Sequence, residues 1–271
     1  MKMETPKRRM GRPKNFNSNE KQTTILALDR ALDVVDALAH ANGMTLSQLS
    51  AHLDQSPATM HRVLATLHAR NFVEMDERAQ TWHIGSAAFR MGSAFLRRSS
   101  IVERSRPIMR ELMEATGETS NLGIERNGVV MFISQVETQE SIRAFFPPGT
   151  LSPMHASGIG KALLSCYSET RTNQYLRMAE LTRFTEKTII LPDMLKNELT
   201  VIREKGWAFD DEEKAEGMRC IAAPIRDIYG EAVAGVSISG PTHRIPKSEV
   251  ERIGALVSDA AAQVSRGLGS S

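Results

Sequence analysis

Apolar residues between positions 45 and 73 recur with a helical period in two short segments that a very short turn separates. Thr45, with Gln48 three residues later, has the spacing of a capping box. Ser56 and Pro57 mark the start of the second segment, because serine caps helices and proline fits their first turn. The apolar positions of the first segment are Leu46, Leu49 and Leu53. This pattern predicts a helix-turn-helix.

One side of the second predicted helix is apolar, and the opposite side has small residues around Arg62. The apolar side comprises Met60, Val63, Leu64 and Leu67. Small side chains let a helix enter the major groove, where arginine bonds guanine and hydroxyls contact base edges or phosphates. The alternative is an ordinary helical hairpin with a solvated face. The predicted DNA contacts of this helix are Ser56, Thr59, His61, Arg62 and Thr66.

The flanking segments favour a winged helix over a plain hairpin. Apolar and polar residues alternate over 72–75 and again over 82–84, which predicts two strands joined by a polar turn. Arg78 lies in that turn and is a further predicted DNA contact. Upstream, a supporting helix is predicted with a core face formed by Ile25, Leu28, Leu32, Val35 and Leu38. We therefore predict a winged helix-turn-helix domain over residues 24–85.

The first 14 residues are strongly basic. Residues 1–23 are predicted to form a disordered arm, and Gly11-Arg12-Pro13 resembles the core of an AT-hook. Met10 stands where the first arginine of that motif is expected. A merely solubilising tail is the alternative. The residues predicted to contact a DNA minor groove are Arg8, Arg9, Arg12 and Lys14.

The composition of the whole chain changes this picture little. A net charge of +2 is too small to indicate nucleic-acid binding by itself. No apolar run approaches the roughly 18 residues that cross a bilayer, and the N-terminus has no apolar signal segment. The two cysteines, Cys166 and Cys220, make neither a disulfide framework nor a metal cluster. We expect a cytoplasmic protein without a membrane segment, metal or cofactor.

The hydrophobic pattern changes near residues 95–100, where we place a domain boundary. Residues 86–100 are predicted to form a linker helix whose apolar edge, typical of pairing surfaces, comprises Phe89, Met91, Phe95 and Leu96. A helix over about 101–115 follows. Strands are then predicted over 118–125, 129–136 and 141–146, with a hairpin turn at Asn127-Gly128. The fold class is α+β, with a second domain over 101–268.

Three segments of this second domain carry candidate chemistry. Ser157 and Gly158 precede an apolar helical run, so free N–H groups at a helix start indicate a small anion site. The alternative is that the glycines only allow close helix-to-sheet packing. An acidic stretch over 207–219 leads to Cys220. Ser237 and Ser239 share one face of a predicted strand, and buried hydroxyls need partners.

These segments, in this order, resemble the isocitrate lyase regulator (IclR) family of bacterial transcription factors. The similarity runs from about residue 24 to 267 and rests on SPATMHRVLATL, MHASGIGKALL, FDDEEKAEGMRCIAAPI and AGVSISGP. It implies a winged helix, a linker helix and a GAF-like α/β effector-binding domain. It also implies a palindromic promoter element of double-stranded DNA as a partner, and homodimers that assemble into a tetramer.

The resemblance also implies an effector site, which is closest to that of glyoxylate-responsive members. It favours a small 2-oxo acid, glyoxylate first and pyruvate next, over another small acid or an aromatic carboxylic acid. With about five heavy atoms, such a ligand gains at most about −7.5 kcal/mol, a micromolar dissociation constant. The implied effector-binding residues are Gly158 and Ile159 through their amides and Asp210, Cys220, Ser237 and Ser239 through their side chains.

A thiol-dependent enzyme and a non-specific DNA binder are the alternatives to a sequence-specific regulator. Cys220 with His155 could form the nucleophile and base of a thiol-dependent enzyme. No nucleophile elbow, metal motif or phosphate loop accompanies the pair, so no catalytic residue is predicted. A non-specific architectural DNA binder would show a steep salt dependence and no preference among duplexes.

Overall fold

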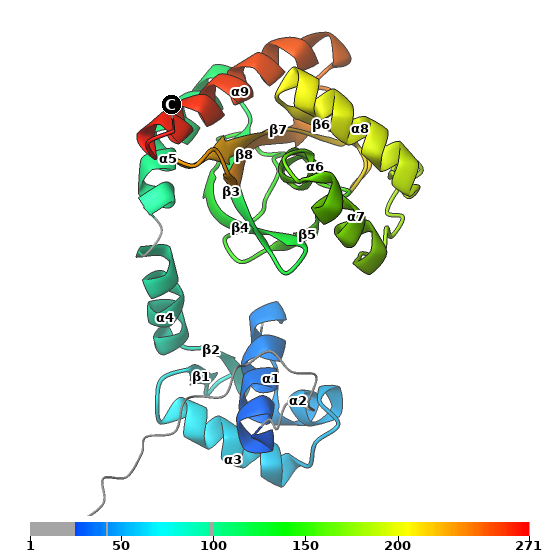
Figure 1. The fold of residues 1–271 in the computed structure, drawn as a ribbon. Coiled ribbons are helices and arrows are strands. Elements are labelled where there is room, and N and C mark those ends of the chain that lie inside the picture. The colour runs from blue at the N-terminus through cyan, green and yellow to red at the C-terminus, as the bar shows by residue number, and fades with distance from the viewer. Residues whose placement is uncertain (1–24, 42, 98–99, 271) are drawn as a thin grey trace, which may run out of the picture. The chain divides into compact units, whose positions relative to one another are not determined.

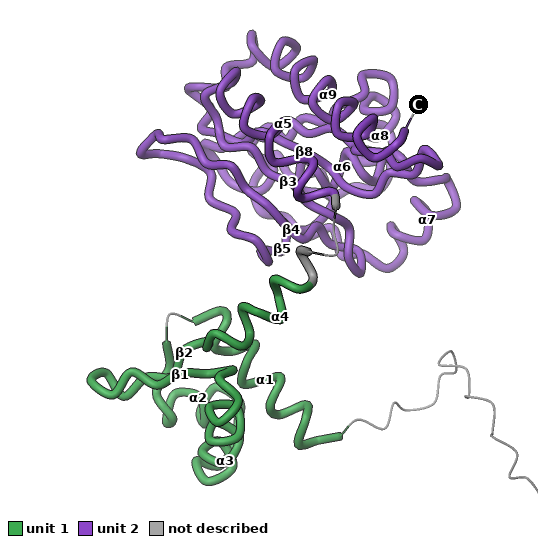
Figure 2. Tube along the Cα trace, turned by 90° about the vertical axis from the view of Figure 1, so that its left-hand side faces the viewer, with its two compact units in different colours: residues 1–94 green, residues 95–271 purple. Residues whose placement is uncertain are grey.

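The computed structural model of the protein describes residues 25–41, 43–97 and 100–270. The chain divides into two compact units, residues 1–94 and 95–271 (Figure 2). The predicted basic arm lies outside the described residues, together with its Arg8, Arg9, Arg12 and Lys14. No helix in the described part of the chain is long and apolar enough to cross a membrane.

The N-terminal unit is a winged helix-turn-helix, as predicted (Figure 1). β1 and β2 form an antiparallel hairpin in which Val73 pairs with Ile84 and Asp76 with Thr81. A single bridge between Met44 and Trp82 widens this hairpin. The elements are α1 (Leu26–His40), α2 (Leu46–His52), α3 (Pro57–His68), β1 (Val73–Asp76), β2 (Thr81–Ile84) and α4 (Ser86–Arg97).

The helix ends of the helix-turn-helix confirm the signals in the sequence. The Gln48 N–H donates to Thr45 Oγ1 at 3.2 Å and the Thr45 N–H donates to Gln48 Oε1 at 2.8 Å, which completes the capping box. The Thr59 N–H donates to Ser56 Oγ at 3.2 Å, and Pro57 opens α3. In the turn between the helices, Asp54 has a φ of 49°, a left-handed conformation that aspartate tolerates better than most residues. These local signals fix the short turn.

The core of this unit confirms the predicted faces of α2 and α3 but corrects that of α1. Val34 and Leu38 are the buried residues of α1, whereas Ile25, Leu28 and Leu32 are 69%, 55% and 58% exposed. Leu38 is the one predicted α1 residue that is fully buried. The apolar residues of α1 form two stripes about 120° apart at 100° per residue, and the stripe with fewer residues packs inward. The longer stripe is therefore left on the surface.

The C-terminal unit is a six-stranded antiparallel sheet between two layers of helices (Figure 1). The strand order is β5-β4-β3-β8-β7-β6. Its helices are α5 (Ser100–Thr116), α6 (Gly158–Ser165), α7 (Glu169–Met178), α8 (Pro192–Lys205) and α9 (Val250–Gly267). Its strands are β3 (Thr119–Arg126), β4 (Val129–Val136), β5 (Leu151–Pro153), β6 (Ala208–Asp211), β7 (Met218–Arg226) and β8 (Ala232–Pro241). The α+β fold class is confirmed.

The two faces of the sheet pack against different helices. Val236 and Ile238 of β8 join the core that α5 and α9 cover. Ala222 of β7 joins the other core, with residues from α6 and α8. Because side chains alternate along a strand, Ser237 and Ser239 point toward the α6 side, as the sequence predicts.

One predicted turn is confirmed and one predicted strand is wrong. Asn127 and Gly128 have φ values of 53° and 82°, as a two-residue hairpin with two left-handed positions requires. Residues 141–146 form no strand, and β5 pairs with β4 instead. The Ile142 carbonyl accepts a 2.7 Å hydrogen bond from Arg244, while Phe146 stacks on Phe132. Ala144 is buried but Ile142 and Phe145 are exposed, so the apolar residues of this segment do not share one packed face as those of a strand would.

Candidate functional site

Four side chains form a polar row across adjacent strands of the C-terminal sheet. In the ladder Asp210 of β6 pairs with Cys220 of β7, Cys220 with Ser239 of β8, and Ser239 with Thr119 of β3. Residues paired in this way point to the same face, here the α6 side. The row places residues that are up to 120 positions apart in the sequence side by side.

The N-terminus of α6 lies directly on this polar row. A Cβ atom added to Gly158 would lie 2.8 Å from Cys220 Sγ and 3.3 Å from Ala222 Cβ, so only glycine allows so close an approach. The Ser157 Oγ accepts from the Gly160 N–H at 3.3 Å. The Gly158 and Ile159 N–H groups, like the first donors of any helix, have no intrahelical acceptor. They form the positive end of the helix dipole beside the row.

A cavity of about 240 Å³ opens where the helix and the row meet. Its apolar wall includes Phe132 and Phe146, whose rings stack with centroids 4.8 Å apart. We call it the effector cavity. The residues that line it are Phe132, Phe146, Ser152, Ala156, Ser157, Gly158, Asp210, Lys214, Ala215, Met218, Arg219, Cys220 and Ser239.

The structure brings four of the six predicted effector residues to this cavity: Gly158, Asp210, Cys220 and Ser239. The side chain of Ile159 is buried in the core between α6 and the sheet, which leaves only its amide for a ligand. Ser237 is fully buried but does not line the cavity, and its Oγ has no hydrogen-bond partner among the described residues. The Ser239 Oγ accepts from Asn121 Nδ2 at 3.3 Å.

Burial changes the protonation of the polar row. It raises the pKa of the Cys220 thiol to about 11, with a smaller contribution from the Asp210 charge. Burial also raises the pKa of Asp210 to about 6, although the Lys161 charge opposes the shift. At neutral pH the cysteine is therefore a neutral thiol, and the aspartate is mostly ionised.

Lys161 is a component of the site that the sequence analysis missed. Its side chain is fully buried, one turn after the start of α6. The Nζ donates to Glu198 Oε1 at 3.0 Å, to the Phe209 carbonyl at 2.5 Å and to Glu213 Oε1 at 2.5 Å. Three acceptors use all three ammonium protons. A lysine inside the otherwise apolar run IGKALL was the available signal.

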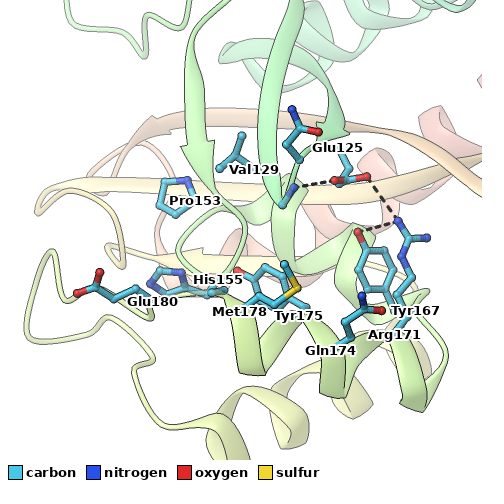
Figure 3. A pocket seen from close by; sticks show the side chains of 13 residues that line it. Glu125, Val129, Pro153, His155, Tyr167, Arg171, Gln174, Tyr175, Met178 and Glu180 are labelled. Atoms are coloured by element: carbon cyan, nitrogen blue, oxygen red, sulfur yellow. Dashed lines mark hydrogen bonds and ion pairs between the residues drawn. The ribbon is translucent and has the colours of Figure 1, made fainter. Parts of the chain in front are cut away.

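His155 lies at a different cavity from Cys220. It lines a cavity of about 470 Å³ between α7 and the β3–β4 hairpin (Figure 3), and its Nε2 bonds the Thr182 carbonyl at 3.0 Å. In that cavity Arg171 Nη2 donates to Tyr167 Oη at 3.1 Å and to Glu125 Oε2 at 3.4 Å. The separation of His155 from Cys220, together with the raised pKa of the cysteine, contradicts the proposed nucleophile and base pair.

The predicted DNA contacts lie on the exposed side of α3 and at the tip of the wing. His61, Arg62, Thr66 and Arg78 are exposed, whereas Thr59 is half-buried. The Ser56 and Thr59 hydroxyls lie 2.9 Å apart at the helix start. The Thr66 hydroxyl donates to the Arg62 carbonyl at 2.9 Å and keeps its lone pairs for other donors. The exposed side of α3 is therefore accessible to a DNA groove.

Residues 27–77 match the family described as IclR helix-turn-helix domain. Residues 93–266 match the family described as Bacterial transcriptional regulator IclR C-terminal. The chain belongs to the IclR family. Members of the IclR family bind DNA through the helix-turn-helix and small-molecule effectors through the C-terminal domain. The chain is therefore a DNA-binding transcriptional regulator with an effector domain.

Individual IclR relatives align with almost the whole chain. The HTH-type transcriptional regulator BhcR of Paracoccus denitrificans is 50% identical over 264 residues, which cover 96% of this chain and 95% of the relative. The transcriptional repressor IclR of Escherichia coli is 37% identical and covers 90% of each chain. The crystal structure of Thermotoga maritima IclR has a TM-score of 0.77 and 28% identity, and it covers 90% of this chain and 99% of that one.

Proposed function

We propose that a small 2-oxo acid, glyoxylate first and pyruvate next, binds in the effector cavity and modulates the binding of this regulator to a palindromic promoter element. The observation that carries the proposal is the placement of the α6 N-terminus on the polar row, beside the effector cavity. A helix N-terminus with free N–H groups favours a carboxylate. The regulator then reads the concentration of that acid.

The contacts of the acid follow from the geometry of the cavity. Its carboxylate accepts hydrogen bonds from the Gly158 and Ile159 amides and from the Ser239 hydroxyl. Charge-assisted hydrogen bonds of this kind contribute about 1.5 to 3 kcal/mol each. Asp210 lies across the row, where it accepts from a hydrated carbonyl or from a bridging water. Ser237 points to the same face of the sheet as Ser239 but does not line the cavity.

A second candidate effector is an aromatic carboxylic acid. One water occupies about 30 Å³ of liquid, so the effector cavity has room for about eight waters, more than a five-atom acid displaces. The stacked rings of Phe132 and Phe146 offer an apolar wall that suits an aromatic ligand. The same α6 N-terminus would hold its carboxylate.

On the DNA side, we propose that α3 enters the major groove and that Arg62 contacts a guanine there. Ser56, Thr59, His61 and Thr66 make the neighbouring contacts, and Arg78 in the wing reaches a phosphate. The basic arm, with Arg8, Arg9, Arg12 and Lys14, lies in an adjacent minor groove.

The protein is proposed to act as a homodimer that assembles into a tetramer. Ile25, Leu28 and Leu32 of α1 form an exposed apolar stripe, and Phe89 and Met91 of α4 are 77% and 64% exposed. Exposed apolar surface of this kind is typical of protein interfaces. Two copies related by a two-fold axis place their recognition helices in successive major grooves, which matches a palindrome.

A promoter gel shift titrated separately with glyoxylate, pyruvate and benzoate tests this proposal. We expect one palindromic element to shift in the absence of the acids, and a 2-oxo acid at micromolar to millimolar concentration to change the shifted fraction. A response to benzoate alone would assign the cavity to aromatic acids. Equal shifts of unrelated duplexes would identify a non-specific DNA binder instead.

A further inference from the structure

Lys161 connects the effector cavity to a buried group of carboxylates. Its ammonium bonds Glu198 of α8 and Glu213 of the loop that follows β6. The Asp210 Oδ1, at the end of β6, accepts from the Glu213 N–H at 2.8 Å. Asp210 itself lines the cavity. A change at Asp210 is therefore one hydrogen bond away from the loop and three from α8.

The carboxylates in this group outnumber the cation that they surround. Asp210 and Glu213 are 7% and 5% exposed, and Lys161 is fully buried. With all carboxylates ionised, Asp210, Glu213 and Glu198 place three negative charges around one positive charge. Burial raises the pKa of Asp210 to about 6 and that of Glu213 to about 7, despite the attraction of Lys161. The group already holds excess negative charge when the cavity contains no ligand.

The other charged groups nearby do not remove this excess. Lys214 and Arg219 also line the cavity. The Arg219 guanidinium donates to Asp211 and to the Ile245 carbonyl, and the Lys214 Nζ lies 3.9 Å from the centroid of the Phe184 ring. Asp211 and Glu212, on either side of the end of β6, pair outward with Lys187, and Asp211 also with Arg219 and Lys247. Cys220 stays a neutral thiol. An acid that enters the cavity therefore brings its negative charge next to Asp210, where Arg219 is already paired with Asp211 and Lys214 is only half-buried.

We propose that Lys161, Glu213 and Asp210 form a proton-accepting triad beneath the effector site, and that the regulator takes up one proton from solvent when a carboxylate effector binds. The inference rests on the proposed function, because it needs an anionic ligand in this cavity. The proton goes to the carboxyl pair of Asp210 and Glu213, and no bond of the effector changes. Lys161 acts as a positioning residue, since it holds both the cavity-lining helix and the loop.

This coupling gives the regulator a pH-dependent affinity. A ligand carboxyl group ionises near pH 3.5, so the ligand keeps its charge throughout the range that matters. Proton uptake then makes the affinity rise as the pH falls, by up to about tenfold per pH unit for one full proton. The rise ends below about pH 6, where the pair is already protonated before the ligand arrives.

The test is calorimetry of the full chain with glyoxylate, pyruvate and benzoate at pH 7.5, in two buffers of different ionisation enthalpy. The difference between the buffers gives the number of protons taken up, and we expect between about 0.5 and 1 per site. In Glu213→Gln the amide oxygen still accepts from Lys161, while Asp210 gains a larger share of the lysine charge and ionises more completely. We expect this variant to bind acid with little proton uptake and a flat pH profile.

Glu216→Gln is the matched control, because Glu216 is exposed on the same loop and the variant loses the same charge. It should behave as the wild-type protein. Binding of any of the three acids without proton uptake overturns the inference and leaves the proposed function intact. Proton uptake with benzoate but no binding of the 2-oxo acids supports the inference and removes the 2-oxo assignment. If none of the acids binds, both the inference and the proposed function are refuted.

Discussion

The close approach of α6 to the sheet makes Gly158→Ala a sharp test of the effector site. The added Cβ would lie 2.8 Å from Cys220 Sγ and 3.3 Å from Ala222 Cβ. The sulfur is buried, and Ala222 packs in the core below α6. Neither neighbour has a long side chain that can swing away, so the start of α6 must lift by several tenths of an ångström.

The size of the effect follows from two opposing contributions. Overpacking of a well-packed core costs about 1 to 3 kcal/mol. Alanine in place of glycine in a helix stabilises the folded state by up to about 1 kcal/mol. We therefore expect a loss of about 0 to 3 kcal/mol in the free energy of unfolding. The displacement also lengthens the bonds from the Gly158 and Ile159 amides to the ligand, which should lower effector affinity at least about tenfold, or about 1.4 kcal/mol.

Chemical denaturation and calorimetry with the effector measure the two quantities. Gly267→Ala is the control, because a Cβ at Gly267, in the last turn of α9, meets nothing within 4 Å. DNA affinity without effector should stay unchanged in both variants. An effector affinity of Gly158→Ala equal to that of Gly267→Ala would refute the assignment of the α6 N-terminus as the carboxylate site.

Three further predictions address the DNA face, the polar row and the buried carboxylates. Arg62→Ala should weaken binding to the cognate element by about 1 to 3 kcal/mol in a gel shift and leave effector binding unchanged; an unaltered DNA affinity would argue against α3 as the recognition helix. Ser239→Ala should lower effector affinity by about 1.5 to 3 kcal/mol in calorimetry, and an equal affinity would exclude its hydroxyl from the site. Because the pKa of Glu213 is raised to about 7 in the folded protein, protonated Glu213 stabilises the fold below its unfolded pKa near 4.5, and this stability is lost as the pH rises through 7. Wild-type protein should therefore lose about 1 to 3 kcal/mol relative to Glu213→Gln between pH 5 and 8, and parallel denaturation curves at the two pH values would contradict this.

Local sequence signals predicted the DNA-binding unit well because its turns and helix ends are set by nearby residues. The capping box at Thr45 and the cap at Ser56 each depend on residues three positions away. The helical period of the apolar residues did not identify the packed side of α1, because α1 has two apolar stripes and the period alone does not distinguish them. Only contacts with α3 and β2 decide which stripe is buried.

The effector site was predictable in part. The glycines at the start of α6 indicated a small anion site, and the alternation at Ser237 and Ser239 placed both hydroxyls on one strand face. The resemblance to the IclR family joined the two patterns in one site. The strand register that aligns Asp210 with Cys220 and Thr119 with Ser239 is a long-range property that no local pattern contains. Lys161 was missed for the same reason, since its acceptors come from β6, α8 and a loop that are 37 to 52 residues away.

The polar row also bears on how effector specificity can diverge. Each of four strands contributes a single side chain to it, and the backbone ladder beneath is independent of what those side chains are. One exchange at Cys220 or Ser239, which line the cavity, would alter the chemistry presented to a ligand while the sheet, α6 and the DNA-binding unit stay as they are. A regulator built in this way can acquire a new effector through single substitutions that leave the protein folded and its DNA-binding unit unchanged.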